Sequence, residues 1–127
     1  MPRTSIVFYQ EAGGVAPVCE WLAHLRRTTP RAYAKCVVRL ERLRELGHEL
    51  RRPEADVLRE GIHELRIRLG RVNYRLLYAF HRRVIAVLLH AVIKEESILE
   101  TDIDLAVARK RTFEQDPDAH ALIEPVK

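Results

Sequence analysis

Hydrophobic positions recur along the chain with two different periods, and the change between them separates a helical part from a strand-rich part. After a short β-rich run over residues 4–9, apolar residues recur every three or four positions over residues 15–25 and again over residues 33–43. This spacing predicts two amphipathic helices. Pro17 and Pro30 stand in the first turns, where proline is tolerated, and Gly47 ends the second helix. We therefore expect a strand followed by an αα-hairpin.

Residues 48–58 are predicted to form a polar connector. From residue 64 onward the period becomes two, as in a half-buried strand. Leu65, Ile67 and Leu69 alternate with charged residues, and a turn at residues 70–71 leads into a second apolar run over residues 72–80. Residues 81–83 turn into a third run over residues 84–92. Three strands joined by short turns predict an antiparallel meander. A last helix begins at residues 101–104, with Ile103, Val107 and Phe113 facing inward.

The element order is therefore β-α-α-β-β-β-α, which predicts an α+β fold. Helices cluster early and strands late, so the helical hairpin is expected to pack on one face of an antiparallel sheet and to leave the other face available. A chain of 127 residues fits one domain, which we place at residues 1–115. Residues 116–127 are polar and contain two prolines, and they predict a frayed tail.

Composition excludes several classes of protein. The chain is 47% hydrophobic and 31% charged, as in an ordinary globular domain. The longest apolar stretch, residues 84–93, is half as long as a bilayer-spanning helix, and the N-terminal residues do not resemble a signal peptide. Cys19 and Cys36 have no paired spacing, which favours reduced thiols of a soluble cytoplasmic protein. No Cys/His spacing matches a metal site, so neither a metal nor a cofactor is expected.

Positive charge is unevenly distributed. The net charge is +4, yet residues 26–52 contain nine Lys/Arg against three acids, and residues 59–83 contain seven arginines against two acids. The last fourteen residues reverse the sign, with four acids and one lysine. Such clustering predicts an anionic partner for the central part of the chain.

Strand alternation gathers part of this charge on one sheet face. Two arginines project together from the first meander strand, roughly 7 Å apart. If the register placed Arg75 beside Arg68, with Lys94 at the end of the third strand, the cations would form one surface. Residues expected on this face are Arg66 and Arg68; Asn73, Arg75 and Leu77; and Leu88, His90, Val92 and Lys94.

Adjacent cations repel one another in an empty sheet, and they are easier to explain if an anion lies among them. The planar guanidinium matches phosphate bidentately. The alternative is a solvated face that merely tolerates arginine.

Three motifs follow one another along the predicted meander. They read GIHELRIR at residues 61–68, NYRLLY at residues 73–78 and LHAVIK at residues 89–94. In this succession they resemble the RelE/HigB-type toxins, most closely the phage-derived HigB-like branch. With the element order, the resemblance extends over about residues 4–113.

The resemblance implies a cytoplasmic, metal-independent endoribonuclease that cleaves mRNA on the ribosome. In this chemistry the 2′-hydroxyl attacks the adjacent phosphorus and leaves a 2′,3′-cyclic phosphate and a 5′-hydroxyl. The resemblance also implies inhibition by a helix-turn-helix antitoxin within a toxin–antitoxin hetero-oligomer.

Carried over by position, the resemblance assigns roles to the basic residues of the meander. Arg75 becomes the oxyanion stabiliser, and Arg68 and Lys94 contact the flanking phosphates. Two acids directly after Lys94 weaken its part. We expect no carboxylate on the face near Arg75, so the general base falls to another group. The predicted site residues are Arg75, Arg68, Lys94, His90 and Tyr78 for catalysis and Arg66, Arg68 and Arg71 for RNA binding.

Two other functions fit the same fold. One is a gyrase-inhibiting toxin of the ParE type, and the other is a non-catalytic protein that binds RNA or an antitoxin. Fold alone does not separate them. The cluster formed by Arg66, Arg68 and Arg75 favours RNA cleavage, because the ParE type needs no such cluster.

Overall fold

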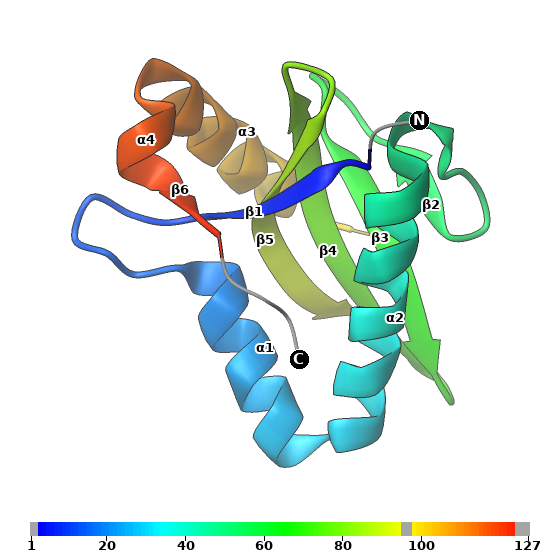
Figure 1. Ribbon diagram of the computed structural model, residues 1–127. Coiled ribbons are helices and arrows are strands. Elements are labelled where there is room, and N and C mark those ends of the chain that lie inside the picture. Colours follow the sequence, from blue (N-terminus) through cyan, green and yellow to red (C-terminus); the bar gives the residue numbers. More distant parts are fainter. Residues whose placement is uncertain (1–2, 95–97, 124–127) are drawn as a thin grey trace.

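The computed structural model describes residues 3–94 and 98–123. Helices lie on both faces of a central sheet (Figure 1). None of the described helices combines the length and apolar character needed to cross a membrane. In chain order the elements are β1 (Ser5–Tyr9), α1 (Pro17–Thr28), α2 (Pro30–Leu46), the 3₁₀ turn η1 (Gly47–Glu49), β2 (Ala55–Val57), β3 (His63–Leu69), β4 (Val72–His81), β5 (Ile85–Lys94), α3 (Glu100–Gln115), α4 (Pro117–His120) and β6 (Ala121–Leu122).

The sheet has the strand order β2-β3-β4-β5-β1-β6. The predicted meander is confirmed, since β3, β4 and β5 pair antiparallel. The expectation of an entirely antiparallel sheet was wrong, because β1 pairs parallel to β5, with Ser5 opposite Ile85. Parallel neighbours need a long crossover, and the helical hairpin together with β2, β3 and β4 provides it. The fold is α+β with a mostly antiparallel sheet.

Two apolar cores lie on opposite faces of the sheet. The α1–α2 hairpin covers one face, where Leu22 and Leu40 pack with Leu76 and Leu88. Helix α3 lies on the other face (Figure 1) and buries its predicted inward residues against β4 and β5. These inward residues are Ile103, Val107 and Phe113. The expected placement of the hairpin on one face is thus confirmed, and α3 occupies part of the other.

A β-bulge in β5 changes which of its side chains share a face. Leu77 of β4 lies opposite His90, but the next residue, Tyr78, lies opposite Leu88, so Leu89 is an extra residue. Leu88 therefore packs under the helical hairpin, while Leu89 packs on the α3 side. The prediction that Leu88 shares a face with His90 was wrong, because a bulge resets the alternation of side chains.

Two segments expected to be irregular contain strands. Residues 48–58, interpreted as a polar connector, include β2, which pairs with β3. Residues 116–122, interpreted as a frayed tail, form α4 and β6, and β6 pairs with β1. His120 also stacks on Tyr9 with 5.6 Å between ring centroids. Strands of two or three residues are too short to produce a recognisable period.

A cluster of aromatic rings at the start of β3 contains a partly buried histidine that makes the free energy of unfolding depend on pH. The ring of His63 stacks on Tyr78, with 5.2 Å between centroids. Burial lowers the pKa of His63, the neighbouring His48 lowers it further, and Asp56 raises it. The unfolded chain then binds this proton more readily than the folded one. The free energy of unfolding is therefore expected to fall as the pH drops below the ordinary histidine pKa of 6.5.

We expect a His63→Gln variant to lose part of this dependence, because glutamine does not titrate. Urea denaturation at about pH 7.5 and about pH 5 measures it as the difference in unfolding free energy. His24, which is exposed on α1, provides the matched control as His24→Gln. If both variants keep the same pH dependence as the unchanged protein, His63 does not contribute to it.

Candidate functional site

The sheet face shared with α3 carries the predicted arginines, and we call the part around Arg66, Arg68 and Arg75 the arginine face. Arg66 lies directly opposite Arg75, and Arg68 lies opposite Asn73. The register that would place Arg75 beside Arg68 is not formed, and the observed register differs from it by two residues. The two-residue connection between β3 and β4 pairs Leu69 with Val72 and thereby sets every later pair. Arg68 is instead a diagonal neighbour of Arg75.

Glu64 links the two opposed arginines. It lies two residues before Arg66 on the same side of β3 and is only 4% exposed. Nη1 of Arg75 donates a hydrogen bond to Oε1 of Glu64, and Nε of Arg66 donates to the same oxygen at 3.1 Å. The expectation that no carboxylate lies near Arg75 was wrong. The signal was present, because strict alternation places Glu64 on the face of Arg66.

Asp56 adds a second carboxylate at the edge of the arginine face. Its Oδ2 accepts a hydrogen bond from Nη2 of Arg66 at 3.2 Å. A hydrogen bond from Arg52 holds the pKa of Asp56 below its ordinary value, and the charge of Arg66 contributes to the same effect. The repulsion between Arg66 and Arg75 is therefore balanced in part by the protein's own acids.

Arg75 keeps one donor unused. Its side chain is 16% exposed, and its buried Nε has no hydrogen-bond partner among the described residues. A buried donor without a partner is uncommon in native proteins. An anion that entered beside Arg75 could accept from this atom if the side chain adjusted.

His90 stands on the same face and is held by an acid of α3. Both Glu64 and His90 lie opposite Leu77, one on each neighbouring strand, so their Cα atoms are about 10 Å apart. Nε2 of His90 is 3.1 Å from Oδ1 of Asp102, in the first turn of α3. Both side chains are mostly buried. A carboxylate in this position fixes the orientation of an imidazole ring.

Sequence reasoning assigned Asp102 only to the start of the helix and missed this contact. Asp102 also caps the helix, since its Oδ2 accepts a hydrogen bond from the backbone N–H of Leu99 at 3.2 Å. The contact with His90 depends on how α3 packs across β5, which no local pattern indicates.

The remaining predicted residues lie in different places. Tyr78 is on the opposite face, fully buried under the helical hairpin, where burial raises its pKa, and the sheet separates it from Arg75. Placing Tyr78 in this site was therefore wrong, because adjacent positions of β4 alternate between faces. Arg71 is exposed in the β3–β4 turn. Lys94 ends β5 opposite Asn73, but its side chain lies outside the described residues, as do the two acids after it.

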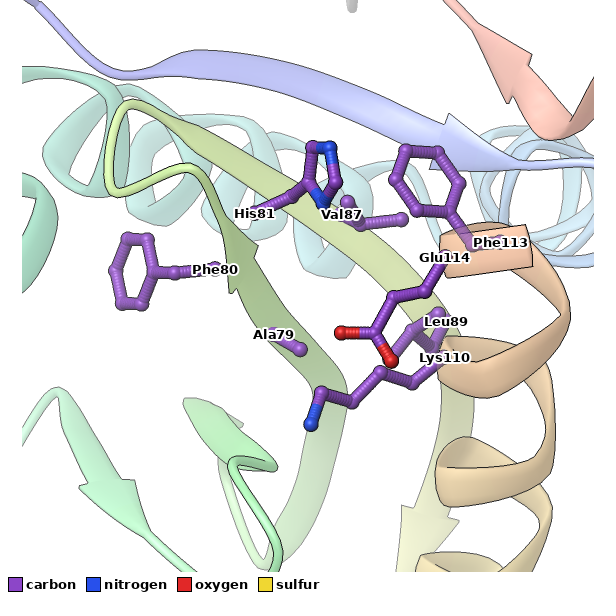
Figure 2. A pocket seen from close by; sticks show the side chains of 8 residues that line it. All are labelled: Ala79, Phe80, His81, Val87, Leu89, Lys110, Phe113 and Glu114. Carbon is purple, nitrogen blue, oxygen red and sulfur yellow. The ribbon is translucent and has the colours of Figure 1, made fainter. Parts of the chain in front are cut away.

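A small cavity lies on the α3 side of the sheet, away from the arginine face. Figure 2 shows Lys110 and Glu114 of α3 extending over Ala79 of β4, with Phe113 beside His81. Its volume of about 10 Å³ matches a single water molecule. It is too small for a nucleotide, and it does not include Glu64 or Arg75.

The arginine face can perform acid–base chemistry on an anionic substrate. It combines a carboxylate that can accept a proton, guanidinium groups that can bind phosphate oxygens, and an imidazole that can donate a proton. Within residues 3–94 and 98–123, no group of three or more His, Cys, Asp or Glu side chains is placed to hold a metal ion. The side chains that could take part in the acid–base chemistry are those of Glu64, Arg66, Arg75 and His90.

Comparison with known proteins places this site within a family. No curated protein matches the chain. A family model described as phage derived protein Gp49-like (DUF891) matches residues 21–111, a span that includes Glu64, Arg66, Arg75, His90 and Asp102. This family is related to the RelE-type toxins of toxin–antitoxin systems. The match covers well over half of the chain, and the protein therefore belongs to the Gp49-like family of phage-derived proteins.

Proposed function

We propose that this protein is the toxin of a type II toxin–antitoxin system and that it cleaves mRNA on the ribosome. The observation that carries the proposal is the contact of buried Glu64 with Arg75 and Arg66 on the sheet face that also holds His90. The arrangement provides a base, an anion-binding pair and an acid for phosphoryl transfer. Membership of a toxin-related family supports the same proposal.

Glu64 acts as the general base in this mechanism. Its carboxylate takes the proton of the ribose 2′-hydroxyl, and the 2′-oxygen attacks the adjacent phosphorus. Arg75 and Arg66 stabilise the charge that develops on the non-bridging oxygens. The phosphate accepts from the Nε–H of Arg75 after the side chain adjusts to expose this buried donor.

His90 acts as the general acid. Its imidazolium donates a proton to the departing 5′-oxygen, and the products are a 2′,3′-cyclic phosphate and a 5′-hydroxyl. Asp102 positions the ring. Glu64 and His90 lie on opposite sides of Leu77 and so reach the two ends of an in-line displacement.

The flanking cations hold the rest of the substrate. Arg68 and Arg71 stand at the turn end of the arginine face, and Lys94 ends the strand opposite Asn73. These residues bind phosphates on either side of the cleaved bond. Because the site is a sheet surface, a second surface must hold the RNA strand against it, and the ribosome provides that surface for a message being translated.

Mapping of 5′ ends by primer extension in cells that express the protein tests the proposal. A reporter message should acquire new 5′-hydroxyl ends when it is translated and remain intact when its start codon is removed. Cleavage of both forms contradicts ribosome dependence. Intact messages together with inhibited DNA supercoiling support a gyrase-inhibiting toxin instead.

A further inference from the structure

The outer edge of β3 extends beyond its neighbour. Strand β2 pairs only with residues from His63 to Leu65, and the N–H of Arg66 donates to the carbonyl of Glu54 at 2.8 Å. Beyond this point, over residues 67–69, the described part of the chain places no strand next to β3 (Figure 1). Since Arg66 directs its N–H outward, Arg68 directs its own N–H to the same side. An open edge of this kind can pair with another strand.

A groove runs beside this open edge, between β3 and α2. Its volume is about 280 Å³. Val38 is 62% exposed in it, although it is a large apolar residue on a helix that otherwise buries its apolar face. The lining residues are Ala34, Lys35, Val38 and Arg39 of α2 with Ile67 and Arg68 of β3.

The chemistry of the groove differs between its floor and its rim. The apolar floor consists of Ala34 and Val38, which are exposed, while Ile67 is only 2% exposed. The rim contains Lys35, Arg39 and Arg68, of which Arg39 has an ion pair with Glu54 at 3.6 Å. A ligand that fits both parts is apolar on one side and anionic on the other.

We propose that the β3 edge and this groove bind an extended protein segment in which apolar and acidic residues alternate. Added as a strand beside residues 67–69, such a segment directs every second side chain to the α2 side, against Ala34 and Val38. The intervening side chains face the other side, where acids meet Arg68 and Arg66. Alternating apolar and acidic side chains on the added strand would thus face the apolar α2 side and the basic side of the β3 edge, respectively.

A single-stranded RNA matches this surface less well. Phosphates could pair with Lys35 and Arg39 and accept from the N–H of Arg68, but a phosphodiester group has no donor for the C=O groups of a strand edge. Bases could cover Val38, yet the edge groups would then remain unpaired. We therefore assign the groove to a protein segment.

Binding of this segment has a functional consequence that rests on the proposed function. Its acids would neutralise Arg68 and lie beside Arg66, which contacts Glu64. The segment would thus exclude RNA from the arginine face without contacting Arg75 or His90. A partner that carries such a segment would be an inhibitor of cleavage.

The test uses the full chain and a short synthetic peptide that alternates valine with glutamate. We expect the peptide to bind and to protect the backbone amide of Arg68 from hydrogen exchange, as followed by NMR. A Val38→Glu variant should weaken binding at least about tenfold, since it places a carboxylate on the apolar floor. Val15→Glu is the matched control, because Val15 is similarly exposed but lies before α1, and it should bind normally.

Several results would overturn the proposal. One is equal binding of a peptide with lysine in place of glutamate, and another is no binding of the glutamate peptide. The proposal is also overturned if Val38→Glu binds the peptide with unchanged affinity, or if the bound peptide leaves the Arg68 amide unprotected. A uridine oligonucleotide that protects Arg68 more strongly than the peptide assigns the groove to RNA. None of these readouts depends on cleavage, so the proposed function is tested separately.

Discussion

Replacing Glu64 by glutamine is expected to lower the rate of mRNA cleavage by about 10²–10⁴-fold, which is the usual contribution of a general base. Glutamine has almost the same shape and can still accept a hydrogen bond from Arg75 or Arg66, but it cannot take a proton from the 2′-hydroxyl. The measurement is a single-turnover rate on ribosomes programmed with one message. Thermal unfolding of the same sample establishes that the variant is folded.

Glu20→Gln provides the matched control. Glu20 is exposed in the first turn of α1, on the far side of the sheet from the arginine face, and its substitution should leave the rate unchanged. A Glu64→Gln protein that cleaves as fast as this control would show that Glu64 is not the base. Its buried position would then reflect only the pairing of two arginines.

Replacing Arg75 by alanine is expected to affect both cleavage and folding. Loss of one donor to the transition state costs about 10²–10³ in rate. The substitution also removes a hydrogen-bond partner of buried Glu64, and we expect the free energy of unfolding to fall by about 1–3 kcal/mol. Single-turnover kinetics and urea denaturation measure the two effects on the same protein.

Two companion variants separate the effects. Arg68→Ala removes a side chain that contacts only the turn carbonyl of Gly70 among the described residues, so stability should change by less than about 0.5 kcal/mol. In the double variant Glu64→Gln with Arg75→Ala, no buried charge loses its partner, so part of the stability should return while cleavage stays lost. An Arg75→Ala protein with full cleavage and native stability would contradict both the assigned role and the energetic account.

The periodic parts of the fold were predictable from the sequence. The helical hairpin, the three meander strands and α3 each span several repeats of their own period, and burial of one side of each element follows from that period. The same alternation placed Arg66, Arg68 and Arg75 on one face and Tyr78 on the other. Tyr78 was assigned to the site for the acid–base chemistry of its hydroxyl, although the alternation already placed it on the other face.

Features that depend on contacts between distant segments were not predictable. The parallel pairing of β1 and the short strand β6 join parts of the chain far apart in sequence. The contact of Asp102 with His90 depends on how α3 packs across β5, and β2 is too short to show a period. The bulge at Leu89 leaves no local signal, because both alternatives place an apolar side chain in a core. The position of Glu64, by contrast, was predictable, because strand alternation places it on the same face as Arg66. The repulsion between the arginines was considered, and their pairing with this carboxylate was overlooked.

The parallel pairing of β1 with β5 constrains the order in which the newly made chain can fold. β1 is separated from its neighbour β5 by the whole helical hairpin and the first two meander strands. Loops of that length close slowly, and contacts of such wide separation form late. His90 lies on the same late strand as the partner of β1, and Asp102 follows it. The β3–β4 hairpin, in which Glu64 contacts Arg75, is therefore expected to form before β1 joins the sheet.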